Sequence, residues 1–398
     1  MNILCALAIA MAVGMAMTRA IKLIHLPNVT AYLVAGLLVG PFILNVLTPE
    51  MNNTLSIISD VALGFIAYSI GGEFKLSYIK EIGAKPLVIT AFEGCVASLL
   101  VFLTLLVLNQ PLPLCLALGA IAAATAPAAT LMVVRQYKAD GPVTKMLLPV
   151  VAMDDALGLM LYAIMMAIAR AIDSGEALSV MTLFVKPMLE IVISLGLGVV
   201  IGIAMVLFLR FFHSRGNKLT MTILVVFLSV GISSMFDLSS LLVCMMVGAT
   251  MINVSNDSTA LLEQCDRFTP PLFLLFFVLS GANLDVSVLP TVGVVGVAYV
   301  FSRAIGKALG ATIGAKIEKC DKNIIRYLGF TLIPQAGVAI GMARMALTDL
   351  PEYGATINAV VLAGTLIYEL TGPVITKIAL TKAGEIKETG KKNQPAVG

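Results

Sequence analysis

Residues Val150-Val-Ala-Met-Asp-Asp-Ala-Leu-Gly158 place two carboxylates, Asp154 and Asp155, side by side in a stretch that is otherwise apolar from about 146 to 169. Neighbouring residues on an α-helix point about 100° apart. The two carboxylates therefore cannot face a single partner equally. We expect one of them to pair with a cationic side chain of the protein and the other to line a cavity.

The composition of the whole chain indicates that this stretch lies in a membrane. The chain has 398 residues, of which 59% are hydrophobic and 12% are charged, and its mean hydropathy is +1.00. Soluble domains have roughly a quarter charged residues. The net charge of +3 and the lack of basic tracts argue against nucleic acid as a partner. Six scattered cysteines and two histidines give no metal-binding spacing. We predict an integral protein of the lipid bilayer.

Polar residues divide the chain into thirteen apolar segments, and we predict that each is a transmembrane helix. A spanning helix needs about 20 residues, and only helices or closed barrels satisfy the backbone in lipid. No alternating strand pattern is present. The predicted segments are 2–18, 30–47, 54–72, 86–108, 112–134, 146–169, 187–210, 219–236, 238–252, 269–283, 288–315, 325–347 and 354–376. They predict a transmembrane domain over 1–380 and a short cytoplasmic tail over 381–398.

The distribution of basic residues predicts the orientation of these helices. The odd-numbered connections and the C-terminal tail carry 21 of the 26 Lys and Arg residues, and the even-numbered connections carry 3. Cytoplasmic loops carry the excess of Lys and Arg. We therefore expect the N-terminus outside and the C-terminus in the cytoplasm of a multi-pass protein of the cell (plasma or inner) membrane.

Two segments are interrupted by proline. Segment 112–134 contains Ala124-Thr-Ala-Pro-Ala-Ala-Thr130, and segment 325–347 contains Leu332-Ile-Pro-Gln-Ala-Gly337. A proline kinks or breaks a helix, and for one proline alone a structural kink is the simpler interpretation. Here each is the middle segment of a three-segment unit, and the two units have opposite orientations. Paired interrupted helices in an inverted repeat are typical of secondary transporters with a site at the midplane. The site residues predicted on these breaks are Thr125, Pro127, Thr130, Pro334 and Gln335.

Other ionisable residues lie within apolar segments. Such residues are costly at membrane depth and usually functional. Arg303 and Lys307 are four residues apart and therefore share one helix face. Glu93 is a candidate pore residue or the partner of a neighbouring group, and both interpretations stay open. Glu369, in Ile367-Tyr-Glu-Leu-Thr-Gly-Pro373, is expected to order the last helix against its partners.

The ordered series of motifs resembles the monovalent cation:proton antiporter family, and within it the cation:proton antiporter-2 branch. The resemblance runs nearly from end to end of the chain. Each motif alone is weak, but the series is specific. It consists of Leu26–Pro41, Ile70-Gly-Gly-Glu-Phe74, Thr125–Thr130, Asp154-Asp155, Phe276–Asn283, Pro334-Gln-Ala-Gly337 and Glu369–Pro373.

The resemblance implies the sodium/proton antiporter fold, in which two broken helices cross at the midplane. Scaffold helices that form a homodimer are interleaved in sequence with core helices at about 86–169 and 288–376. The resemblance implies that Asp155 binds the ion and the proton, and that Asp154 pairs with a buried cation. Lys307 is the best match for that cation, and Arg303 is the second choice. Some relatives carry an acid where this chain has Ala126, which leaves ion selectivity open.

The predicted function is exchange of a monovalent cation for protons by alternating access, with a role in pH homeostasis. Na⁺ is the expected cation, and Li⁺ and K⁺ are the alternatives. Two buried aspartates and Lys307 allow two protons per cation, which would make the exchange electrogenic. No enzyme activity, no cofactor and no nucleotide-binding regulatory domain are expected. A sodium-coupled organic-anion symporter on the same fold is the alternative. An intramembrane aspartyl protease is disfavoured, because its two acids must lie on facing helices.

Overall fold

The computed structural model describes residues 2–23, 26–72, 74–77, 83–174, 185–212, 214–236, 238–255, 258–284 and 292–386. Within these ranges the chain forms 17 helices and no strand. Each of the thirteen predicted segments contains at least one of these helices. Seven helices are long and apolar enough to cross a membrane, and the bent pair α13–α14 would make an eighth. The all-helical, multi-pass architecture is therefore confirmed, whereas the count of thirteen membrane crossings stays a prediction.

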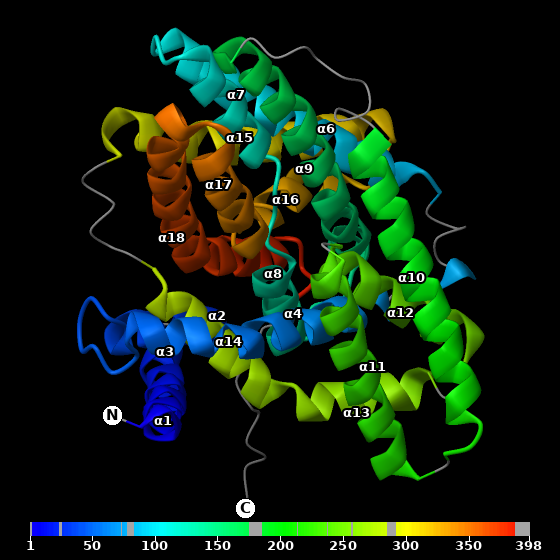
Figure 1. The fold of residues 1–398 in the computed structure, drawn as a ribbon. Helices are drawn as coiled ribbons and strands as arrows, with labels where there is room; N and C mark the ends of the chain where they lie inside the picture. The colour runs from blue at the N-terminus through cyan, green and yellow to red at the C-terminus, as the bar shows by residue number, and fades with distance from the viewer. Residues whose placement is uncertain are drawn as a thin grey trace, which may run out of the picture.

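The helices pack as two groups. In Figure 1 most helices of the first group are drawn below most helices of the second. We call the first the scaffold group. Within it, α14 packs on α2 and α4, and α12 packs on α4 and α10. The scaffold helices are α1 Ile3–Lys22, α2 Asn28–Val39, α3 Pro49–Thr54, α4 Ser56–Gly71, α10 Lys186–Leu209, α11 Arg215–Met235, α12 Ser240–Val254, α13 Ser258–Phe268 and α14 Pro270–Ala282.

The second group, which we call the core group, contains two units of the same design. Each unit has a long helix, then two short helices separated by a break, then a longer helix. The first unit is α6 Lys85–Val107, α7 Leu112–Ile121, α8 Pro127–Tyr137 and α9 Pro142–Ser174. The second unit is α15 Gly293–Ile317, α16 Lys322–Thr331, α17 Gly337–Asp349 and α18 Pro351–Lys382. The two units share one apolar core, in which residues of α6, α7 and α9 pack against residues of α15, α17 and α18.

Regularly spaced glycines let α15 of the second unit pack closely against α6 of the first unit. Gly306, Gly310 and Gly314 recur every four residues and so lie along one face of α15. A Cβ added at these glycines would lie 2.5–2.8 Å from backbone atoms of α6, including the Cα of Glu93. Small residues at such spacing let the backbones of two membrane helices approach closely. The close approach brings the side chains of α6 and α15 to one buried centre.

The helix ends follow from local sequence. Pro127 occupies the first position of α8, where a backbone N–H would have no partner within the helix. Asn2, Ser214 and Asp321 accept hydrogen bonds from the first turns of α1, α11 and α16. At α9 the cap comes from far along the chain. The Glu385 carboxylate, which follows α18, accepts hydrogen bonds from Val143 N at 2.6 Å and from Thr144 N at 2.8 Å. This cap ties the two units together at one end.

Candidate functional site

The site is built where the two helix breaks meet. Residues 122–126 separate α7 from α8, and residues 332–336 separate α16 from α17. The breaks touch through a backbone hydrogen bond of 2.8 Å from Ala126 N to Pro334 O. Thr130 Oγ1 adds a bond of 3.2 Å to Thr331 O. Four half-helix ends therefore converge, and each end carries backbone groups that lack partners within its helix.

Lys307 projects from α15 to this crossing and is fully buried. Its Nζ donates hydrogen bonds to the Ala123 carbonyl, to Thr125 Oγ1 at 2.7 Å and to Asp154 Oδ2 at 2.9 Å. The Glu93 Oε2 atom lies 2.7 Å from the same nitrogen. One ammonium group therefore faces two carboxylates, both of which are also completely buried.

The carboxylates are less well satisfied than the lysine. Glu93 Oε2 lies within ion-pair distance of Lys307, but Glu93 Oε1 accepts no hydrogen bond from any described residue. Oδ1 of Asp154 likewise has no hydrogen-bond partner in the described part of the chain. If all three groups are ionised, their charges sum to −1. Such a centre attracts a proton or a small cation, because an uncompensated charge is costly in a buried site.

Arg303 lies one turn from Lys307 on the same face of α15 but has different partners. Its guanidinium donates to Ala122 O at 3.0 Å, to Ala124 O at 2.6 Å and to Ile333 O at 2.7 Å. It also stacks on the Tyr368 ring, with 4.6 Å between Cζ and the ring centroid. Arg303 therefore binds the backbone of both breaks, and Lys307 is the cation that pairs with Asp154.

Gln335 closes the crossing on its other side. Its Nε2 donates to Ile121 O at 3.1 Å and lies 2.9 Å from the Tyr299 hydroxyl. That hydroxyl in turn lies 3.2 Å from Gln335 Oε1. Both side chains are fully buried. The second break is thereby joined to α7 and α15 by side chains as well as by backbone.

The predicted site residues have different outcomes. The structure brings Asp154, Lys307, Thr125, Thr130, Pro334 and Gln335 together at the crossing, with Pro127 opening α8 beside it. The backbone of Asp155 lies in α9, but its side chain is outside the described residues. Glu369 is not among the partners of Lys307. It accepts bonds of 3.1 and 3.2 Å from Ser280 of α14 and so contacts the scaffold group, in line with its expected ordering role.

Sequence reasoning left the role of Glu93 open and missed Tyr299. The contact between Glu93 and Lys307 could have been inferred from the glycines at positions 306, 310 and 314. They predict that α15 packs tightly on another helix, and Glu93 is the acid of the apolar segment 86–108. Tyr299 lies two turns before Lys307 on α15, but nothing in its local sequence distinguishes it from a core tyrosine.

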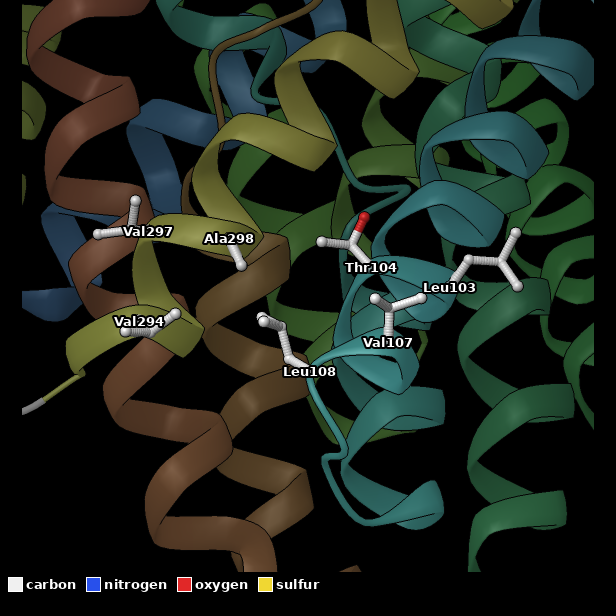
Figure 2. Close-up of a pocket in the computed structure, with 7 residues that line it drawn as sticks. All are labelled: Leu103, Thr104, Val107, Leu108, Val294, Val297 and Ala298. Carbon is white, nitrogen blue, oxygen red and sulfur yellow. The ribbon is translucent and has the colours of Figure 1, made fainter.

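The described residues offer no site for a resident metal of the usual kind, since they contain no cluster of three or more His, Cys, Asp or Glu side chains. All six cysteines are free thiols. A groove of about 460 Å³ opens between the ends of α6 and α15 (Figure 2). Its lining is apolar apart from Thr104, whose hydroxyl bonds to Leu100 O within α6. This groove is therefore unsuited to conducting ions.

Comparisons with known proteins point to one family. Residues 7–380 match the family described as sodium/hydrogen exchanger, transmembrane. The Na(+)/H(+) antiporter NhaS4 of Synechocystis sp. is 22% identical over 409 residues, which cover 96% of each chain. The sodium proton antiporter MjNhaP1 from Methanocaldococcus jannaschii at pH 8 has a TM-score of 0.69 at 18% identity, covering 96% of this chain and 98% of that one. An electron-microscopy structure of MjNhaP1 has a TM-score of 0.74 at 17% identity, covering 98% and 100%. At these identities the two solved structures show a shared fold.

Proposed function

Because this chain belongs to the sodium/hydrogen exchanger family, we propose that it exchanges a monovalent cation for protons by alternating access. The observation that carries this proposal is the buried Asp154–Lys307 pair, with 2.9 Å between Oδ2 and Nζ, at the crossing of two broken helices. Broken helices around a buried ionisable pair are the arrangement that secondary transporters use for small ions. The adjacent acids Asp154 and Asp155 favour the cation:proton antiporter-2 branch of these exchangers.

Exchange follows from competition at the carboxylates. A carboxylate oxygen that holds a proton is a poor ligand for Na⁺, and one that binds Na⁺ has released its proton. Asp155 is the proposed ion- and proton-binding carboxylate, with Asp154 as its neighbour in the same site. Thr125 and the carbonyls freed by the breaks, such as Ala123 O, supply further oxygens and hold Lys307 in place. Hard cations such as Na⁺ prefer oxygen ligands of this kind.

Two protons per cation are the proposed stoichiometry. One proton binds at Asp155, and the second resides on Asp154 or on Lys307 when their pair opens. The cycle then moves one net charge, and a full elementary charge contributes about 2.3 kcal/mol per 100 mV of membrane potential. Na⁺ is the proposed cation. The N-terminus is proposed to lie outside and the C-terminus in the cytoplasm, in a homodimer in the cell membrane.

Purified protein in proteoliposomes with a trapped pH-sensitive dye tests the activity. We expect the addition of NaCl to move protons, and parallel additions of LiCl and KCl rank the cations. Asp155→Asn should abolish the signal, because an amide can neither take up nor release the proton. Exchange by Asp155→Asn at the wild-type rate would remove Asp155 from the mechanism. A wild-type signal that required an organic anion would instead support the symporter.

The stoichiometry has its own test. Proteoliposomes with valinomycin and set potassium gradients clamp the membrane potential while exchange is followed. If two protons cross per cation, the exchange rate should change with the imposed potential. A rate that is the same at all potentials would leave one proton per cation and a purely structural role for one aspartate.

A further inference from the structure

Lys307 has more acceptors within reach than it has protons to donate. An ammonium group carries three N–H donors. Four oxygens surround this one, namely Ala123 O, Thr125 Oγ1, Asp154 Oδ2 and Glu93 Oε2. Glu93 Oε2, at 2.7 Å, is as close as Thr125 Oγ1, so three donors serve four acceptors. Asp154 and Glu93 therefore compete for the donors of one ammonium group.

Glu93 cannot leave this position for a better partner. It lies on the face of α6 that packs against Gly310, where a Cβ would meet the Glu93 Cα at 2.5 Å, and its side chain is completely buried. A buried carboxylate whose hydrogen bonding is incomplete is unfavourable. An ion pair whose only task is stability is expected to satisfy both partners. The incomplete hydrogen bonding of Glu93 therefore suggests that this residue has a role in another step of the transport cycle.

We propose that Glu93 is the alternative partner of Lys307, which accepts its third hydrogen bond whenever Asp154 binds the transported cation. This inference rests on the proposed function of the site. Asp154 can bind a cation through Oδ2 only if Lys307 no longer donates a hydrogen bond to that oxygen. The Lys307 nitrogen that is released lies 2.7 Å from Glu93 Oε2, which can accept the hydrogen bond instead. Rotation about the Cε–Nζ bond and a small shift of the ammonium suffice for this exchange. Lys307 keeps a carboxylate partner in both states, so the second proton of the cycle is carried in this scheme by Glu93 instead of by Asp154 or Lys307. Glu93 is protonated while Asp154 pairs with Lys307, and it releases that proton when it accepts the hydrogen bond from Lys307.

Replacement of Glu93 should therefore destabilise the cation-bound state and leave the stability of the cation-free state unchanged. In the cation-free state Lys307 is satisfied by Ala123, Thr125 and Asp154. In the cation-bound state of a Glu93 variant, Lys307 would lose its carboxylate partner while it remained buried. Leaving one member of a buried charge pair without its partner is strongly unfavourable. That cost falls on cation binding and not on folding without the cation.

The first experiment uses Glu93→Gln, which keeps the size of the side chain and removes its charge. We expect the apparent KM for Na⁺ in proteoliposomes to rise about tenfold, the equivalent of about 1.4 kcal/mol. The Na⁺ concentration that half-stabilises the purified protein against heat should rise in parallel, with Tm in Na⁺-free buffer unchanged. Glu93→Asp, which keeps the charge, should recover part of the affinity. The control is Thr104→Val on α6, since the Thr104 hydroxyl bonds within its own helix to Leu100 O at 2.7 Å.

The second experiment needs no transport measurement. Asp154→Asn alone leaves Lys307 with Glu93 and should lower Tm less than Lys307→Ala combined with Asp154→Asn. Adding Glu93→Gln to Asp154→Asn removes both carboxylates and should lower Tm sharply, although Glu93→Gln alone does not. The Tm changes of the two single variants should therefore fail to add.

The outcomes separate this inference from the proposed function. A Glu93→Gln variant with wild-type apparent KM, or additive Tm changes, would overturn the role of Glu93 and leave cation/proton exchange intact. A loss of Tm in Na⁺-free buffer with an unchanged KM would show that Glu93 is only structural. A wild-type protein that moves no protons with any cation would instead refute the proposed function.

Discussion

Arg303 shows how a single residue stabilises the crossing. Its three carbonyl partners, Ala122, Ala124 and Ile333, belong to the breaks that follow α7 and α16. The C-terminal ends of helices carry unpaired carbonyls and the negative end of the helix dipole. A planar guanidinium presents five donors in a fixed fork, so it can satisfy several carbonyls at once. Lys307 is then left free to exchange partners among the acids.

Arg303→Lys tests this division between the two cations. A single ammonium cannot reach three carbonyls at Arg303's distances and also stack on Tyr368. Each buried acceptor left unpaired costs about 1–3 kcal/mol. We expect a clear loss of Tm, measured on detergent-purified protein, despite the conserved charge. If Arg303→Lys melts like the wild type, positive charge alone is sufficient at this position.

At the level of elements, the packing of α6 on α15 positions the acids and the cations of the site. Glu93 lies on one helix, Arg303 and Lys307 lie on the other, and the glycines of α15 let the two backbones touch. Beyond this contact, the C-terminal end of α6 and the N-terminal end of α15 line the apolar groove of Figure 2. The tight contact runs along α15 from Gly306 to Gly314 and includes the level of the site. There it limits how far Glu93 can lie from Lys307.

Gly310→Ala should disturb this geometry. The added Cβ would approach Phe92 O and Glu93 Cα at 2.5 Å, and because both are backbone atoms α6 itself would have to shift. Overpacking of this kind costs about 1–3 kcal/mol, so we expect a lower Tm and impaired exchange. The matched control is Gly196→Ala on α10, where an added Cβ would have no atom within 4 Å. Equal Tm values for the two variants would mean that the contact between α6 and α15 can accommodate the added methyl group.

At the scale of the whole molecule, two polar contacts join α8 of the core group to the scaffold group at one face. There Arg135 of α8 pairs with Asp266 of α13 at 2.9 Å, and Asn28 N of α2 donates to Gln136 Oε1 of α8 at 2.8 Å. At the opposite face a polar cavity of about 640 Å³ lies between the 41–56 region, the end of α14 and Arg344 of α17. Polar contacts therefore join the two groups at the α8 face, and a cavity lies between them at the other.

The alternating access proposed above would require these α8 contacts to break in each cycle. We expect the pair Asn28→Cys with Gln136→Cys, in a background without the six native cysteines, to stop exchange when it is oxidised and to recover on reduction. The measurement is proton movement in proteoliposomes, with the two single-cysteine variants as controls. Undiminished exchange by the oxidised pair, with cross-linking verified on a gel, would mean that α2 and α8 move together.

The sequence by itself determined the class of the protein and the inventory of its site. Apolar runs of spanning length require helices in lipid, and proline predicts where two of them break, so these features depend on local physics. The rarity of charge in such segments singled out Asp154, Lys307, Arg303 and Glu93 without any knowledge of the fold.

The family resemblance implied the pair of Asp154 and Lys307, and the tertiary structure decided the other partners of these charges. Arg303 and Lys307 share a helix face, and their different partners follow from one turn of rise along α15 relative to the crossing. Glu93 reaches Lys307 because α15 packs on α6 at glycine distance. Glu385 caps α9 from more than 200 residues away along the chain. Contacts between residues so far apart depend on how all the helices pack together. A local pattern can show that a buried charge needs a partner, but it cannot show which one.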